Sequence, residues 1–221
     1  MNIFDVIGPV MIGPSSSHTA GAARIGNVAR KLLAEDPRRA EILLHGSFAE
    51  TYRGHGSDRA MIGGILGLLP SDSLLKDSFQ LAKKQHLVFE FAPSDLGDVH
   101  PNTCKILLYG DHKSISVTAS SVGGGQIQVV EINGAQVDFS AEYNTTIIFN
   151  RDRAGTVADV TRILSDSHVN IAFMRLFREF EGEDAIMILE TDEPVCESTL
   201  ELLRQTPNVC EVIFLEPFTQ G

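Results

Sequence analysis

The hydrophobic pattern of residues 143–221 constrains the fold more than any other feature of this chain. Runs typical of strands cover residues 143–149, 169–177, 185–190 and 209–215. Apolar residues recur at helical spacing over residues 154–167 and 195–205. The resulting order, βαββαβ, is that of a ferredoxin-like domain, in which helices cover one face of an antiparallel sheet. We therefore predict such a domain over residues 143–221.

Residues 1–142 are glycine-rich and mix helical and strand patterns, which predicts a separate α+β domain. Helical spacing, with serine or aspartate as N-caps, covers residues 15–36, 57–69 and 73–84. Short apolar runs predict strands over residues 41–45, 88–91, 104–109, 114–119, 126–132 and 135–138. Asn133-Gly134 separates the last two, which is a strong hairpin signal. The overall class is thus α+β with two domains.

Composition excludes several classes of protein. The 43% hydrophobic content supports a buried core, and the net charge of −11 argues against nucleic acid as a partner. Three cysteines without CxxC spacing fit a reducing compartment. The sequence contains no apolar run approaching the roughly 20 residues that span a bilayer, and its first residues do not resemble a signal peptide. We expect a cytoplasmic protein with no membrane association.

Two loops of the C-terminal half resemble those of an ACT domain, a small module that binds free amino acids. They are Asn150-Arg151-Asp152-Arg153-Ala154-Gly155 and His168-Val169-Asn170-Ile171. The resemblance implies a free amino-acid effector, with Asp152, Gly155 and Asn170 as candidate effector-binding residues, and a homodimer contact through the sheets. Free N–H groups at a helix start suit a carboxylate, and an asparagine can both donate and accept hydrogen bonds. The alternative is that these residues only cap a helix and form a turn.

Three segments of the N-terminal half contain histidines in polar, glycine-rich surroundings. The segments are Gly13-Pro14-Ser15-Ser16-Ser17-His18-Thr19, then Gly46-Ser47-Phe48-Ala49 with Gly54-His55-Gly56-Ser57-Asp58-Arg59-Ala60, and His100-Pro101-Asn102-Thr103. Hydroxyls crowded at a helix start can hold a carboxylate. The glycines around His55 leave its imidazole accessible for proton transfer near neutral pH. A capped helix, a solvated loop histidine and a simple turn are the alternatives.

Together these segments resemble the beta chain of iron–sulfur L-serine dehydratases, in the family's order and over nearly all of residues 1–142. The N-terminal domain is also similar to the allosteric substrate-binding domain of phosphoglycerate dehydrogenase. No G-x-G-x-x-G follows a predicted strand, so dehydrogenase activity is not implied. The family resemblance implies deamination of L-serine to pyruvate and ammonia, with a [4Fe–4S] cluster as the Lewis acid. No G-x-S-x-G motif supports a hydrolase, and no basic helix-turn-helix supports a transcription regulator.

A cluster of this kind needs three or four thiolates, and this chain has three cysteines without a common motif. We therefore expect no metal ligands here and a cluster ligated by the alpha subunit, without which this chain is inactive. By resemblance, His55 is the candidate base for the Cα proton and His18 the second candidate. Ser15, Ser16, Ser17 and Asn102 are candidate substrate-binding residues. The competing hypothesis is a purely regulatory subunit that senses amino acids and has no catalytic residues.

Overall fold

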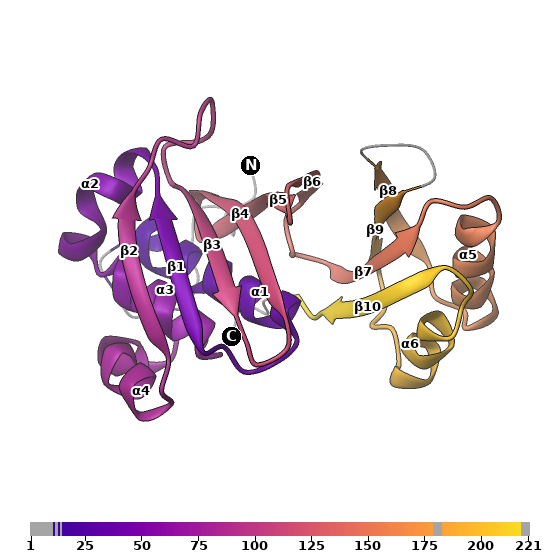
Figure 1. Cartoon of the computed structure of the whole chain (residues 1–221), viewed down its shortest axis with the longest axis horizontal. Helices are drawn as coiled ribbons and strands as arrows, with labels where there is room; N and C mark the ends of the chain where they lie inside the picture. The colour runs from indigo at the N-terminus through magenta and orange to yellow at the C-terminus, as the bar shows by residue number, and fades with distance from the viewer. Residues whose placement is uncertain (1–10, 12, 14, 179–182, 218–221) are drawn as a thin grey trace. The chain divides into compact units, whose positions relative to one another are not determined.

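The computed structural model describes residues 11, 13, 15–178 and 183–217. They cluster into two compact units that divide between Ser140 and Ala141. Each unit has its own sheet (Figure 1) and is described by itself. Within the described residues, no helix is both long enough and apolar enough to cross a membrane.

The N-terminal unit is built on a six-stranded sheet in the order β2-β1-β3-β4-β5-β6. Only the β1–β2 pair is parallel, and each of the other pairs is antiparallel. Its strands are β1 (Arg39–Leu44), β2 (Val88–Pro93), β3 (Thr103–Tyr109), β4 (Ser114–Gly123), β5 (Gln126–Ile132) and β6 (Ala135–Phe139). Its helices are the π-helix η2 (Ser16–Gly21), α1 (Ala22–Leu33), α2 (Gly46–His55), α3 (Ser57–Ile65), the 3-10 helix η3 (Ser73–Asp77) and α4 (Ser78–Lys84).

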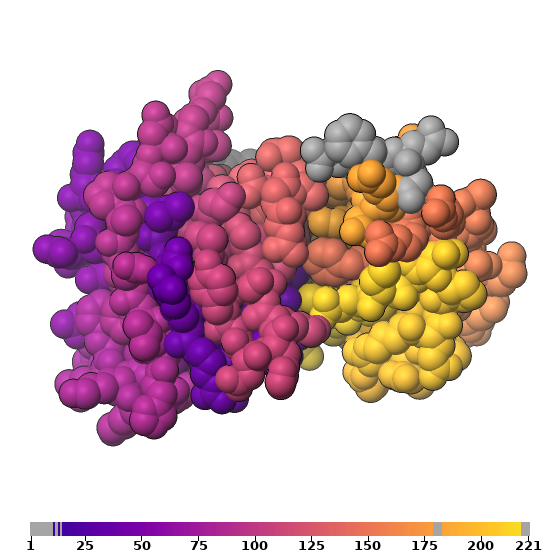
Figure 2. All heavy atoms as spheres, viewed as in Figure 1, coloured from indigo at the N-terminus to yellow at the C-terminus, as the bar shows by residue number. Residues whose placement is uncertain are grey.

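Helices α1 and α3 lie on one side of this sheet (Figure 1). Alternate strand residues on that side, such as Ile42, Ile106 and Val117, are fully buried because each strand turns every second side chain toward the helices. Seen from the opposite side, the side chains of β2, β1 and β3 reach the surface without a helix over them (Figure 2). The hydrophobic core of the unit is therefore a single layer between the sheet and the helices.

Helices α1 and α3 pack unusually closely because glycines face the contact. A Cβ built on Gly64 would overlap the carbonyl oxygen of Ala23, and a Cβ built on Gly26 would overlap that of Met61. Each missing side chain lets one backbone approach the other directly. This contact fixes where η2, at the start of α1, lies relative to the start of α3.

Helix α2 is the main difference from the sequence prediction, which placed no helix over residues 46–55. The local sequence does not predict this helix, because it contains two glycines and its N-terminus is uncapped. The residue before the helix, His45, makes no side-chain capping bond. Tertiary contacts stabilise the helix, because its local helix propensity is weak. Phe48 is fully buried, and Gly46, at φ 50°, lies so close to Pro101 that no side chain would fit. The predicted helix over 57–69 also ends early, at Ile65.

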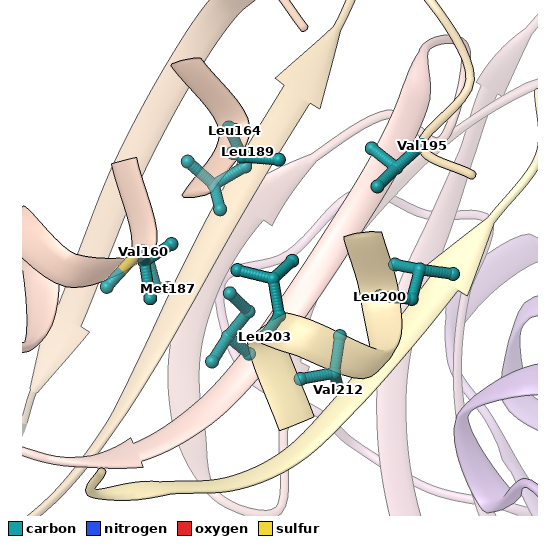
Figure 3. Close-up of a cluster of buried hydrophobic side chains, with 9 residues drawn as sticks. Val160, Leu164, Met187, Leu189, Val195, Leu200, Leu203 and Val212 are labelled. Carbon is teal, nitrogen blue, oxygen red and sulfur yellow. The ribbon is translucent and has the colours of Figure 1, made fainter. Parts of the chain in front are cut away.

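The second unit confirms the predicted ferredoxin-like fold. It contains β7 (Asn144–Arg151), α5 (Thr156–Asp166), β8 (Ile171–Arg178), β9 (Asp184–Thr191), α6 (Glu197–Arg204) and β10 (Val209–Leu215). The strand order is β10-β7-β9-β8, with all neighbours antiparallel. Side chains from α5, α6 and the sheet form one core (Figure 3) around Val160, Leu164, Met187, Leu189 and Leu203.

The close packing of α1 on α3 predicts opposite effects for two Gly→Ala substitutions. Gly64→Ala should destabilise the protein by about 1–3 kcal/mol, because its methyl group must displace backbone. Gly54→Ala in α2, where no atom lies within 4 Å of the added Cβ, should be neutral or stabilise by up to about 1 kcal/mol through helix propensity. Urea unfolding of both variants measures this. Equal midpoints for the two variants would contradict the proposed packing.

Candidate active site at the start of helix η2

The three histidine-containing segments singled out in the sequence meet at one place in the structure, together with strand β4. The Ser121 hydroxyl, on β4, donates to the carbonyl of Ser17 at 2.9 Å. The Ser121 N–H donates to the carbonyl of Asn102, also at 2.9 Å. On the other side, the Phe48 N–H of α2 donates to the carbonyl of Pro101 at 3.5 Å. The His100–Thr103 segment thus bonds to α2 directly and to η2 through Ser121 of β4.

His18 lies at the centre of this cluster and is half-buried. Its Nδ1 is 3.4 Å from the Ser15 hydroxyl, and its Nε2 is 3.3 Å from the Ser47 hydroxyl. Its ring also meets Phe48 edge-on, with 5.4 Å between the ring centroids. Partial burial, and secondarily the charge of His55, lower the pKa of His18 below its usual 6.5. His18 is therefore held as a neutral, positioned imidazole at neutral pH.

His55 is the last residue of α2, and its side chain is exposed. The alternative of a solvated loop histidine is wrong, because His55 belongs to a helix. Gly56, at φ 72°, caps α2 and at the same time begins α3. This abrupt change of direction turns the His55 ring toward His18, with 4.7 Å between the centroids and 75° between the planes. A positive charge on His55 at this distance disfavours a second positive charge on His18.

The proposed substrate-binding residues have different surroundings. Ser15 is the N-cap of η2, and its hydroxyl accepts the His18 N–H at 3.2 Å. Ser16 begins η2, and Ser17 contributes its carbonyl to the Ser121 bond. The Asn102 side-chain oxygen is buried without a hydrogen-bond partner within the described residues. A buried acceptor of this kind is costly unless a ligand satisfies it, which makes Asn102 a good candidate for substrate contact.

Ser47 was missed as a functional candidate, although it stands in the G-S-F-A segment. Its role depends on α2, which local sequence does not predict, so only the fold shows it beside His18. Gly123 and Gly124 lie in the turn between β4 and β5, where a Cβ on either would face open space. Their positive φ values show that the β4–β5 turn itself requires glycine.

The candidate effector residues of the second unit do not come together within one chain. Strands β7 and β8 run in the same direction, because both are antiparallel to β9. Asp152 and Gly155 follow the end of β7, whereas Asn170 precedes the start of β8, so the two loops lie at opposite ends of the sheet. The length of β7 therefore separates the two loops by roughly 25 Å. Asp152 pairs with Arg178 at 2.7 Å, and Asn170 donates to Asp192 at 2.6 Å. A ligand that contacts both loops would need a second copy of the chain.

The cysteines of this chain do not fit an iron–sulfur cluster. Cys104 is fully buried in β3, and its burial raises the thiol pKa far above the usual range, so it stays protonated. Cys196 and Cys210 are exposed and belong to the other unit. Across the described residues, no group of three or more histidine, cysteine or acidic side chains could hold a metal ion.

These features define an α+β protein that joins a histidine-containing site to an ACT domain, and the ACT family model matches residues 145–208. The family model for the serine dehydratase beta chain matches residues 2–77. A Bacillus subtilis (strain 168) protein named "Probable L-serine dehydratase, beta chain" is 41% identical, over 96% of both chains. The L-serine dehydratase beta chain of Peptoniphilus asaccharolyticus is 42% identical, over 88% of this chain and 89% of that one. The chain belongs to the L-serine dehydratase beta chain family.

A further relative supports the predicted architecture of both domains. The D-3-phosphoglycerate dehydrogenase of Methanocaldococcus jannaschii is 28% identical over 86% of this chain but only 36% of its own length. The match therefore covers a part of that enzyme that corresponds to most of this chain. This confirms the predicted similarity to phosphoglycerate dehydrogenase.

The lowered pKa of His18 predicts a pH-dependent stability. The unfolded chain binds a proton at His18 near pH 6.5, whereas the folded protein binds it only at lower pH. Stability should therefore fall as the pH drops below 6.5 and be fully present above it. Urea unfolding at a series of pH values should show a smaller loss for His18→Gln than for the unmodified chain. Parallel pH profiles for the two proteins would show that burial does not disfavour the charged imidazole.

Proposed function

We propose that this chain, together with an alpha subunit, deaminates L-serine to pyruvate and ammonia, and that it is inactive alone. The two relatives above are named L-serine dehydratase beta chains, and they match nearly the full length. Because no cysteine arrangement of this chain fits a cluster, the proposed [4Fe–4S] cluster belongs to the alpha subunit. The contribution of this chain is then a set of acid–base and binding residues.

The single observation that supports a catalytic role is the contact between His18 and His55, both of which lie within the residues that the family model matches. In the proposed reaction, His55 takes the proton from Cα as a C=C bond forms and the β-hydroxyl leaves as hydroxide, and return of that proton to the hydroxide gives water. The resulting enamine tautomerises to the imine by moving a proton from nitrogen to Cβ, and hydrolysis of the imine by one water releases ammonia and leaves pyruvate. His55 suits the role of base because its exposed ring can reach a substrate bound from outside the chain.

His18 would act through His55. Hydroxyls of Ser15 and Ser47 hold its ring, and a charge on His55 disfavours a charge on His18. This keeps a single proton on the pair once His55 has accepted it. Ser15, Ser16, Ser17 and Asn102 are proposed to contact the substrate, with the unpartnered Asn102 oxygen as acceptor for its ammonium group.

The ACT unit would pair with a second copy and bind a free amino acid there. Its sheet ends at β8, whose outer edge has no neighbouring strand in the described chain. Exposed apolar side chains cover this edge strand, namely Phe173, Met174 and Leu176. An unprotected apolar edge strand is a typical place for association. Pairing would also supply the second copy that a site made from both effector loops requires.

Replacement of His55 tests the catalytic role. His55→Gln should lower the rate of pyruvate formation by about 10²–10⁴-fold in the complex with the alpha subunit, because it removes the general base. The assay is anaerobic serine turnover by the co-purified complex. His112→Gln, at an exposed position of the β3–β4 turn, is the matched control and should retain normal turnover.

Two results would contradict this proposal. Near-normal turnover of a His55→Gln complex would remove His55 from the mechanism. Substantial turnover by the alpha subunit alone, reconstituted with its cluster, would favour the purely regulatory alternative over shared catalysis.

Substitution on β8 tests the proposed pairing. Leu176→Lys places a charge on the apolar edge strand and should shift the chain from dimer to monomer in sedimentation velocity. Leu202→Lys introduces the same charge at a similarly exposed leucine of α6 and should leave the dimer intact. An unchanged dimer in the Leu176→Lys variant would place the contact elsewhere.

A further inference from the structure

His100 belongs to one of the three histidine-containing segments, but the proposed reaction assigns it no role. It is exposed and lies directly before the turn, formed by Pro101 and Asn102, that leads into β3. Its ring nitrogen Nδ1 accepts the backbone N–H of Asn102 at 3.1 Å. Asn102 is also the residue whose side-chain oxygen is buried without a hydrogen-bond partner in the described part of the chain. The imidazole of His100 therefore holds the backbone of a proposed substrate-binding residue.

This hydrogen bond restricts the chemical state of the His100 ring. A backbone N–H can only donate, so Nδ1 must present a lone pair to the N–H of Asn102. A neutral imidazole meets this requirement when its proton is on Nε2, whereas a protonated imidazole has no acceptor nitrogen. His100 thus acts in this contact as a neutral hydrogen-bond acceptor.

The other backbone groups of this segment are bound by distant parts of the unit. Each backbone carbonyl of residues 100–103 accepts a hydrogen bond. In chain order, the donors are the Thr103 hydroxyl at 2.5 Å and the N–H groups of Phe48, Ser121 and His45 at 3.5, 2.9 and 3.0 Å. Of the two turn residues, Pro101 has no N–H, so the N–H of Asn102 is the one backbone donor of the turn. Its acceptor is the His100 imidazole.

The peptide that joins Pro101 to Asn102 is the least firmly held part of this turn. Its carbonyl bonds to Phe48 at 3.5 Å, which is longer than the usual 2.7–3.2 Å for an N–H···O bond. On either side, Gly46 packs against Pro101, and Thr103 is fully buried. The orientation of this peptide therefore depends mainly on the bond from its N–H to His100.

We propose that His100 is a positioning residue whose neutral imidazole orients the Pro101–Asn102 peptide and, through it, the Asn102 side chain that contacts the amino-acid substrate. The proposal rests on the proposed function, because it takes Asn102 as a contact of L-serine. A binding group that is held in place before the substrate arrives costs less to order on binding. His100 then affects substrate binding and takes no part in proton transfer, in contrast to His55.

Three substitutions of His100 test this role through KM for L-serine in the complex with the alpha subunit. His100→Ala should raise KM about three- to tenfold with little change in kcat, because the turn loses one hydrogen bond. His100→Asn should recover most of this loss, because Oδ1 of asparagine is attached to Cγ, as Nδ1 of histidine is, and can accept the N–H two residues further on. His100→Gln should not recover it, because its oxygen lies one bond further from the backbone. His112→Ala, at an exposed position of the β3–β4 turn, is the control and should leave KM unchanged.

A double-mutant cycle tests whether His100 acts through Asn102. Asn102→Ala should raise KM by itself. Addition of His100→Ala to that variant should then cause little further increase, because the side chain that His100 positions is already absent. Independent effects that multiply in the double variant would show that His100 acts elsewhere and would overturn the proposal.

The remaining outcomes separate this proposal from the proposed function. Unchanged KM in His100→Ala, while His55→Gln is inactive, would overturn the positioning role and leave the catalytic role of His55 intact. A His100→Asn complex with the same loss as His100→Ala and a lowered kcat would assign the imidazole itself to the reaction and would also overturn it. Absence of serine turnover in the unmodified complex would overturn the proposed function and this role with it. If His100→Ala does not fold, as judged by thermal unfolding, the comparison of His100→Asn with His100→Gln decides, because both keep a polar side chain at this exposed position.

Discussion

The candidate site depends on close backbone contacts that only glycine permits. A Cβ on Gly21 would overlap the Ser121 side chain, and one on Gly46 would lie 2.7 Å from the Pro101 carbonyl oxygen. Gly64 allows a similar approach of α3 to α1. Together these contacts bring η2, α2 and the loop before β3 close to one another. A side chain at Gly46 or Gly64 would have to displace the backbone of Pro101 or Ala23.

Within that cluster, His18 and His55 have different surroundings. Around His18, partial burial and hydroxyl partners favour a neutral imidazole. On the other side of His55, Arg59 and Lys76 line a small pocket whose exposed surface is largely apolar. The two histidines therefore stand between a polar hydroxyl cluster and an apolar hollow.

The strength of the local signal explains how much of the fold could be predicted. The ACT unit was predicted in its full order because each of its helices and strands shows a clear apolar period around one core, including Val160, Leu164 and Leu203. Helix α2 was missed because its stability comes from the burial of Phe48 and from the Pro101 contact, both of which are distant in sequence. The same helix places Ser47, so that residue was missed too.

By itself, the sequence determined the α+β class, the ACT fold and the histidine-containing motifs, because periodicity and short motifs are properties of neighbouring residues. It also determined that three scattered cysteines make a poor cluster site. Only the tertiary structure decided that His18 touches His55, that Asn102 has a buried and unpartnered oxygen, and that Arg59 and Lys76 line one pocket. The reason is physical: contacts between residues far apart in the chain depend on how helices and sheet pack, and packing is set by the whole core at once.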